Sequence, residues 1–344
     1  MDIRAVEEVE QINNLISQMA SVRNVKTYEM RKNPFDMYDD EEFRRKYRFS
    51  KDGVRFLDQL FGNSLSQDKR GGGLSSVLQI LIALRYWGHD AADIHGLTQQ
   101  SVSTVCHRVA RAILEKRFDY IKIPTSLNDQ LKNIQQFEAI AGFKNVLGAI
   151  DCTHIRITKV QGPSGQYYIN RKGYSSLNVQ VVCDATLKIM NIVARWRGST
   201  HDSRIFNESQ LKQCFEREQV RGRLLGDSGY ACTPYLFTPV LNPTTRKEEA
   251  YNYAHIRTRN SVERCFGVWK NRFRCLLSGF RTSLPNTKMY IVALAVLHNI
   301  AIELKEEPIS DDDDETLPSP PTAPSSQNTL RGAAVRAIFI EENF

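Results

Sequence analysis

The chain has 344 residues, a hydrophobic content of 41% and a net charge of +7, which suit a soluble protein with a large core and two domains. Its longest strongly apolar run, residues 291–297, is too short to span a bilayer, and residues 1–20 lack the apolar block of a signal peptide. Seven cysteines without a Cys-x-x-Cys pair favour reduced thiols inside the cell, and seven histidines show no zinc-ligand spacing.

The charge is distributed unevenly. Residues 303–316 hold eight acidic residues and one basic residue, and residues 317–344 are neutral, so residues 1–302 carry +14. A basic body suits a polyanionic partner, although charge alone does not exclude a merely soluble basic protein. We expect residues 303–329, which are acidic and proline-rich, to be a disordered linker that samples the basic body transiently, and residues 330–344 to contain a short helix.

The N-terminal part reads as helical. Residues 1–49 are polar and predict a partly disordered lead-in, and residues 50–130 predict a helical region. In it, Leu74–Trp87 is apolar on nearly every side, as a buried helix is. After a turn at Asp90–Leu97, a second helix is expected over Ser101–Leu114, with Ser101 as its N-cap. It combines an apolar inner stripe with an outer face that includes the candidate DNA contacts Arg108 and Arg111.

This arrangement of helix, glycine-containing turn and helix is that of a helix-turn-helix, which places its second helix in the DNA major groove. Any small helical bundle gives similar spacing, so a purely structural bundle remains the alternative. Residues 117–143 read as a connector.

Three strands follow. Val146–Asp151 is a short apolar run that ends on an acid, Leu177–Asp184 alternates, and Ile189–Arg195 follows after a tight turn. They predict an antiparallel meander. A carboxylate beside the core of a sheet needs a cation or hydrogen bonds to compensate its lost hydration. Asp151 is therefore either satisfied by backbone donors in a turn or part of a functional site.

A basic loop with interleaved aromatic residues, Tyr168–Tyr174, separates the first two strands. Its Arg171 and Lys172 are candidates for phosphate contact, with stacking on the aromatic rings. A solvated basic loop is the alternative reading of the same residues.

Two further acids follow similar patterns. Asp202 stands at the start of a helix expected over Arg204–Phe215, where it either caps the helix or lies at the sheet edge near Asp151. Asp227 ends the apolar run that begins at Arg223, and glycines on either side allow close backbone approach. Acids at the ends of two separate strands predict a shared site.

A strong amphipathic helix is expected over Arg257–Leu276, and Glu263 lies at the rim of its buried stripe. The bland reading is a solvated Glu263 that pairs with Arg259 and Lys270. The functional reading is a metal ligand beside a phosphate backbone, with three basic residues as candidate phosphate contacts: Lys270, Arg272 and Arg274. The apolar helix Met289–Leu304 follows, and its His298 and Asn299 read as a satisfied core pair.

The order of these features is that of a ribonuclease-H-like fold with a DDE triad, and 35 residues separate Asp227 from Glu263. The chain resembles the PIF/Harbinger transposase superfamily, including its domesticated nucleases. The matching residues are Gly148–His154, Asn170–Gly173, Asp202 with Ser203, Leu225–Ser228, Val262 and Glu263 with Phe266, Arg272–Leu276 and Leu297–Asn299.

The resemblance covers about residues 50–302 and implies an α/β fold. Specifically, we expect a ribonuclease-H-like mixed sheet flanked by helices, with an N-terminal all-helical, helix-turn-helix-like region. The DDE endonuclease domain would span residues 144–302.

The implied function is a divalent-metal-dependent DNA endonuclease that cleaves phosphodiester bonds and catalyses strand transfer. In the family, Asp151, Asp227 and Glu263 correspond to the catalytic triad, and the acid that matches Asp202 is assigned to the metal site. Clustered carboxylates repel one another, so they need divalent cations to coexist, and Mg²⁺ or Mn²⁺ suits such oxygen ligands. One ion would activate the attacking water or 3′-hydroxyl and the other would stabilise the leaving oxygen.

The resemblance also implies double-stranded DNA as the partner and no membrane. Similar families work with a separate Myb-like DNA-binding protein, which supplies DNA-end recognition and nuclear import, so we expect a nuclear protein that is also cytoplasmic. A homo-oligomer stays open. Two alternatives remain: a catalytically silent DNA-binding regulator, which loss of a triad acid would favour, and a nuclease without transposition activity. No triad acid is lost here.

Overall fold

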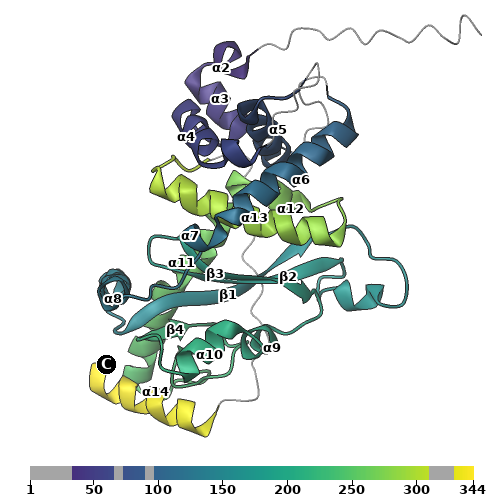
Figure 1. Ribbon diagram of the computed structural model, residues 1–344. Coiled ribbons are helices and arrows are strands. Elements are labelled where there is room, and N and C mark those ends of the chain that lie inside the picture. The colour runs from purple at the N-terminus through teal and green to yellow at the C-terminus, as the bar shows by residue number, and fades with distance from the viewer. Residues whose placement is uncertain (1–32, 66–72, 90–96, 310–328) are drawn as a thin grey trace, which may run out of the picture.

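A five-stranded mixed sheet lies at the centre of the protein, with helices on both faces (Figure 1). The computed structural model describes residues 33–65, 73–89, 97–309 and 329–344. Residues 1–32 of the expected lead-in, residues 90–96 of the expected turn and residues 310–328 of the expected acidic linker lie outside the described residues. The strands, in chain order, are β1 (Val146–Arg156), β2 (Ser176–Cys183), β3 (Ile189–Arg197), β4 (Arg223–Leu225) and β5 (Leu236–Phe237).

The spatial order of the strands is β3-β2-β1-β4-β5. The first three form the predicted antiparallel meander, because β1 pairs with β2 and β2 with β3 in opposite directions. The other two are parallel: β4 runs beside β1, and β5 runs beside β4. The expected α/β class and mixed sheet are therefore confirmed.

Strand β1 is longer than the sequence predicts. Its apolar run was expected to end near Asp151, but the strand continues to Arg156. The continuation is stabilised because Thr153 and Ile155 are buried and the whole segment stays paired with β2, with Asp151 opposite Val181. Asp151 therefore lies in the middle of a strand and not in a turn.

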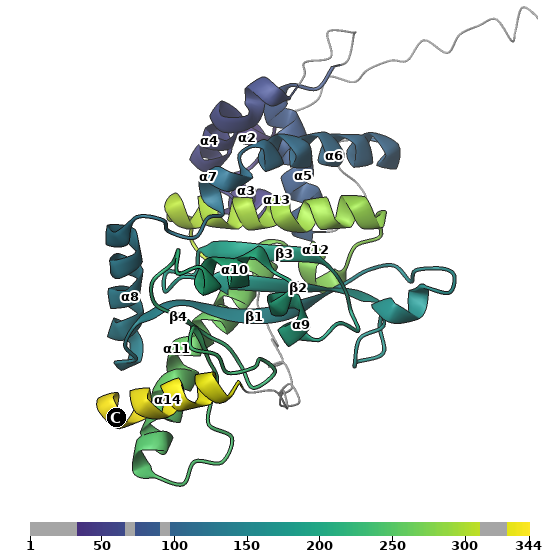
Figure 2. The ribbon, with the colours of Figure 1, turned by 60° about the horizontal axis from the view of Figure 1, so that its bottom comes forward.

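Helices cover both faces of the sheet, and Figure 2 shows the same layers from a second direction. Helix α11 crosses β1 and β2, and α13 packs against β3. The short helices α9 and α10 lie on the opposite side of the sheet. The bounds of these and the neighbouring helices are α8 (Leu127–Ala141), α9 (Asp202–Asn207), α10 (Gln210–Glu216), α11 (Arg246–Arg272), α12 (Cys275–Ser278), α13 (Leu284–Glu303) and α14 (Leu330–Asn343).

Several helix boundaries differ from the sequence-based expectation. Helix α11 begins at Arg246 instead of Arg257, because Thr245 and Glu248 form a reciprocal capping box at its start. The single helix expected over 204–215 is two helices, and Ser209 caps the second of them. The expected connector 117–143 contains α8, which Ser126 caps and Gly142 ends.

The N-terminal helices form a layer on top of α13 (Figure 1). Two of them lie within the segment expected as a lead-in, and their Phe43 and Tyr47 are buried. The N-cap of α6 is Thr98, not Ser101. The described elements of this layer are α2 (Pro34–Met37), α3 (Asp40–Tyr47), α4 (Lys51–Phe61), the 3₁₀ turn η1 (Gly62–Ser64), α5 (Ser76–His89), α6 (Gln99–Glu115) and α7 (Arg117–Tyr120).

One continuous apolar core joins this helical layer to the sheet. Polar contacts reinforce the junction: the backbone N–H and hydroxyl of Ser50 both donate to the Glu306 carboxylate, with the hydroxyl at 2.6 Å from Oε1. Among the described residues, no helix is long and apolar enough to cross a membrane.

His298 and Asn299 on α13 form the core pair that the sequence predicts, but the buried Nδ1 of His298 has no hydrogen-bond partner among the described residues. The Nε2–H of His298 donates to the Leu187 carbonyl at 2.8 Å, and the Asn299 side chain accepts from the Ile189 N–H at 2.7 Å. Both residues are buried, and burial lowers the pKa of His298 to about 4.

Acid should therefore weaken the fold through His298. Its pKa falls from 6.5 to about 4 on folding, so its contribution is complete above pH 6.5 and is lost as the pH falls toward 4. His298→Gln keeps an N–H donor but does not titrate. Between pH 7 and pH 5, the free energy of unfolding should fall by about 2 kcal/mol more in the wild type than in the variant. Urea unfolding at both pH values measures this, and equal losses would contradict it.

Candidate active site

Asp151 is the acid at the centre of the site. It lies in the middle of β1 with 17% of its side chain exposed. Its Oδ1 accepts from the backbone N–H of Cys152 at 2.7 Å, and its Oδ2 accepts from Nη1 of Arg259 at 3.1 Å. Both carboxylate oxygens are therefore hydrogen-bonded, one of them by a cation from α11.

Two further acids lie near Asp151. Asp227 follows β4, the parallel neighbour of β1, and its Oδ1 accepts from the Gly229 N–H at 2.9 Å. Asp202 is the first residue of α9, and its Oδ1 accepts from Nδ2 of Asn178 on β2 at 2.8 Å. The sheet pairing and the start of α9 thus bring together acids that are far apart in the sequence.

Electrostatics shows how closely these acids interact. Burial raises the pKa of Asp151 to about 7, the Arg259 guanidinium opposes this rise, and the negative charges of Asp227 and Asp202 add to it. Burial also raises the pKa of Asp202, and the charge of Asp227 contributes. Arg259 is the cation that pairs with Asp151, and its charge offsets only part of the negative charge of these acids.

Glu263 approaches the site from α11. Half of its side chain is exposed, and it forms an ion pair with Arg259 one helical turn away. Arg259 therefore bridges Asp151 and Glu263. Burial acts to lower the pKa of Arg259, but the charges of Asp151 and Glu263 outweigh burial and raise it. The alternative prediction was that Glu263 pairs with both Arg259 and Lys270. The structure shows the contact with Arg259, whereas Lys270 bonds to another residue.

The donor set suits a hard divalent cation. Within the residues that the structure describes, no three His, Cys, Asp or Glu side chains form a ready-made metal cluster. The oxygens of Asp151, Asp202 and Asp227 are nevertheless the ligand type that Mg²⁺ and Mn²⁺ prefer, and the raised pKa of Asp151 marks an electrostatic demand for positive charge. These residues therefore fit such an ion.

Candidate phosphate contacts surround the acids at different depths. Lys270 donates from Nζ to the Thr153 hydroxyl at 2.6 Å, two residues along β1 from Asp151, and burial lowers its pKa to about 8. Arg171 and Lys172 are exposed in the loop after η2 (Gly165–Tyr168), and Nη2 of Arg171 lies 3.1 Å from Nδ1 of His201, the neighbour of Asp202.

Other candidates have different places. Arg272 is a correction: its guanidinium is buried and donates to the backbone carbonyls of Arg48, Glu306 and Glu307, so it joins the helical layer to the sheet and is not placed to bind phosphate. Arg108 is half-buried and donates to Gln79 at 3.2 Å, whereas Arg111 is exposed on α6. Arg274 is half-buried just before α12.

Sequence reasoning missed two supporting residues. Asn178 is a buried polar residue in a strand whose every residue is buried, and it holds Asp202. Arg259 was considered only as a helical partner of Glu263, yet it also reaches Asp151. The first is one of three polar residues in this buried strand, with Ser176 and Gln180, and local sequence does not single it out. The second depends on how α11 crosses β1, which no local pattern shows.

Comparison with known proteins agrees with this geometry. Residues 150–299 match the family model of the DDE superfamily endonucleases, a range that contains all four acids. Over 278 residues the chain is 32% identical to the human protein "Putative nuclease HARBI1", which covers 78% of this chain and 79% of that protein. The chain belongs to the DDE superfamily endonuclease family. The predicted resemblance to Harbinger-derived nucleases is thereby confirmed.

Other relatives of this DDE endonuclease occur in animals and plants. The Xenopus laevis protein of the same name is 30% identical over 279 residues, covering 78% of this chain and 80% of the relative. "Protein ALP1-like" of Arabidopsis thaliana is 27% identical over 271 residues, covering 71% of this chain and 65% of the relative. No solved structure matches this chain significantly.

Loss of the bridging cation should destabilise the fold. Arg259→Gln leaves the buried Asp151 carboxylate without its cation, so the free energy of unfolding at pH 8 should fall by about 3 kcal/mol. Adding Asp151→Asn removes the uncompensated charge and should recover most of this loss. Urea unfolding of both variants measures the effect. Arg264→Gln, an exposed arginine on the same helix, is the matched control. Additive losses in the double variant would argue against the bridge.

Proposed function

We propose that this DDE endonuclease is a divalent-metal-dependent nuclease that cleaves double-stranded DNA. Asp151, Asp227 and Glu263 are its catalytic triad, and Asp202 is a further metal ligand. The observation that carries the proposal is the placement of Asp151 in the middle of β1, with Asp227 following the parallel neighbour β4 and Asp202 held by Asn178 of β2. The family match over residues 150–299 supports the same assignment.

The residues of the candidate active site have distinct roles in this chemistry. Bound Mg²⁺ or Mn²⁺ would polarise the scissile phosphodiester and lower the pKa of the attacking water. Asp151, Asp202 and Asp227 would supply oxygen ligands to such an ion, and Glu263 would supply one from α11. Asn178 keeps Asp202 oriented through its 2.8 Å hydrogen bond. Before a metal ion binds, Arg259 holds Asp151 and Glu263 close together through its two ion pairs.

The same arrangement serves strand transfer if the nucleophile is a 3′-hydroxyl in place of water. The four carboxylates would take the same places in both reactions, because the charge that develops on the attacking and leaving oxygens is the same in kind.

DNA contact is the second part of the proposal. Residues 1–302 carry +14, and Arg171 and Lys172 are exposed in the loop from which Arg171 contacts His201, the neighbour of Asp202. Lys270 places a cation on the sheet face that also carries Asp151. On α6, the exposed Arg111 extends the candidate DNA surface to the helical layer. Such basic residues give sequence-independent phosphate affinity.

Removal of a triad acid should abolish cleavage. Asp151→Asn and, separately, Asp227→Asn should lower the rate of supercoiled-plasmid nicking with Mg²⁺ or Mn²⁺ by about a hundredfold or more, because metal stabilisation of the transition state is worth several kcal/mol. Circular dichroism should show an intact fold.

The matched control is Asp119→Asn, the same change at an exposed acid on α7, which should nick at the wild-type rate. Retention of nicking by both triad variants would remove these residues from the chemistry. A wild-type chain that binds DNA without nicking under either metal would favour the silent regulator.

Salt dependence should separate phosphate contacts from structural arginines. If Arg171 and Lys172 each contact a phosphate, changing both to Ala should reduce the slope of log K against log salt by about 2 for duplex DNA. Lys132→Ala with Lys144→Ala, two exposed lysines on α8 and the loop after it, is the control pair and should leave the slope unchanged. An equal change in both pairs would show that only net charge matters.

A further inference from the structure

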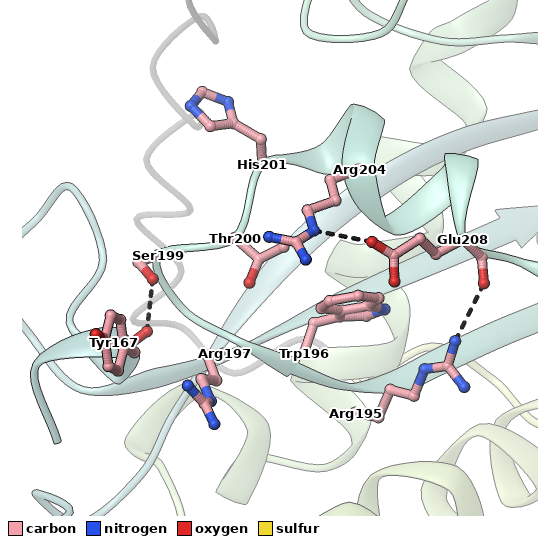
Figure 3. Close-up of a pocket in the computed structure, with 9 residues that line it drawn as sticks. All are labelled: Tyr167, Arg195, Trp196, Arg197, Ser199, Thr200, His201, Arg204 and Glu208. Carbon is pink, nitrogen blue, oxygen red and sulfur yellow. Dashed lines mark hydrogen bonds and ion pairs between the residues drawn. The ribbon is translucent and has the colours of Figure 1, made fainter. Parts of the chain in front are cut away.

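A cavity of about 660 Å³ lies beside the proposed active site, and the proposed metal ligands do not line it. Figure 3 shows that its walls come from η2, the end of β3, the loop at 199–201 and helix α9. Its volume falls within the range of about 300–1,000 Å³ that is usual for small-ligand sites. Sequence reasoning considered Arg171 and Lys172 in the adjoining loop but did not find this cavity.

The cavity is rigidly connected to the acids. Asn178 donates to the Thr200 carbonyl, in the cavity wall, and to Asp202, both at 2.8 Å. Asn178 also lies opposite Trp196 in the pairing of β2 with β3, so both side chains point to the same face of the sheet. A molecule in the cavity would therefore lie at a fixed position relative to Asp202.

Aromatic rings and arginines line the cavity together. The Arg197 guanidinium lies 5.3 Å from the ring centre of Tyr167, and Tyr167 is 49% exposed. Arg195 and Arg204 lie 5.5 and 5.6 Å from the ring centre of Trp196. Such pairs offer flat faces for stacking beside cationic N–H donors.

The cavity also has an excess of positive charge. Its three arginines face one acid, Glu208, whose carboxylate pairs with Arg204 at 2.9 Å. The Arg195 guanidinium donates only to the backbone carbonyl of Glu208, at 3.1 Å. Among the described residues, no acidic side chain pairs with Arg197. The cavity thus combines an anion-binding group with aromatic surfaces.

We propose that this cavity binds one unpaired nucleotide of the DNA strand, with the base stacked on the Tyr167 and Trp196 rings and a phosphate on Arg197. The inference rests on the proposed function, because it supplies the DNA. Stacking on aromatic rings with arginine contacts to phosphate is the chemistry of single-strand binding. Bases inside a duplex are stacked on one another and cannot enter a concave site, so the nucleotide must leave the stack.

Tryptophan fluorescence can test this directly. The chain has three tryptophans, and Trp87 and Trp269 are fully buried, so quenching by a ligand should report Trp196. We expect a short oligothymidylate to quench the full chain without divalent metal, and Trp196→Phe to lose that quenching. A blunt, fully paired duplex and tripolyphosphate, which lacks bases, should quench much less. Equal quenching by tripolyphosphate would overturn base stacking in favour of simple anion binding.

Affinity measurements locate the contacts. Tyr167→Ala and Arg197→Ala should each weaken oligothymidylate binding, followed by fluorescence anisotropy, by about tenfold or more. The matched control pair is Tyr253 and Arg257 on α11, which have the same 5.3 Å ring-to-guanidinium distance and a tyrosine that is 62% exposed. Their Ala variants should bind like the wild type, and circular dichroism confirms that each variant folds.

Quenching that persists in Trp196→Phe would also overturn the proposal, and so would equal loss of affinity in both tyrosine–arginine pairs. Neither measurement needs cleavage, so the outcome is separable from that of the nicking assay. A chain that fails to nick but binds the oligonucleotide at Trp196 would refute the proposed function and keep this site. If a chain with Tyr167 and Arg197 replaced nicks normally and binds the oligonucleotide with unchanged affinity, the proposed function stands and this nucleotide site is refuted.

Discussion

The placement of a carboxylate in the middle of a buried strand is the constraint on which the site depends. Asp151 gives up hydration in β1, and the fold compensates it with the Cys152 N–H and the Arg259 guanidinium. Because Arg259 belongs to α11, this ion pair ties the long helix to β1, alongside the apolar packing of Val262, Cys265 and Trp269. Glu263 follows one turn later on the same helix, so its approach to the acids is a consequence of the same ion pair.

The features that were predictable from sequence are those set by short stretches of chain. Apolar runs that end on Asp151 and Asp227 are visible locally, and so is the meander that β2 and β3 complete. The start of α11 was missed although Thr245 and Glu248 stand in the sequence at capping-box spacing, because the apolar stripe that guided the expectation begins later. Propensity and periodicity weigh the middle of a helix more than its ends.

The sequence-based predictions that were wrong or missing concern residues whose positions depend on contacts with segments far away in the sequence. Arg272 looks like a surface cation by type, but carbonyl groups from residues 48, 306 and 307 receive its guanidinium in the core. The aromatic and basic cavity has the same origin: its walls come from η2, β3 and α9, and long-range contacts such as that of the Ser199 hydroxyl with the Tyr167 carbonyl bring them together. One residue, Asn178, then ties this cavity to Asp202.

The shared core between the helical layer and the sheet has a consequence for how DNA would be handled. Helix α6 packs on α13, and α13 packs on β3, so among the described residues one packed core connects the candidate DNA-contacting helix to the sheet. If α6 binds a groove of the DNA, the packing of α6, α13 and β3 determines the distance along the duplex from that groove to the cleaved bond. The protein would then cut at one fixed distance from the contacted groove, and each target would have to present its scissile bond at that distance.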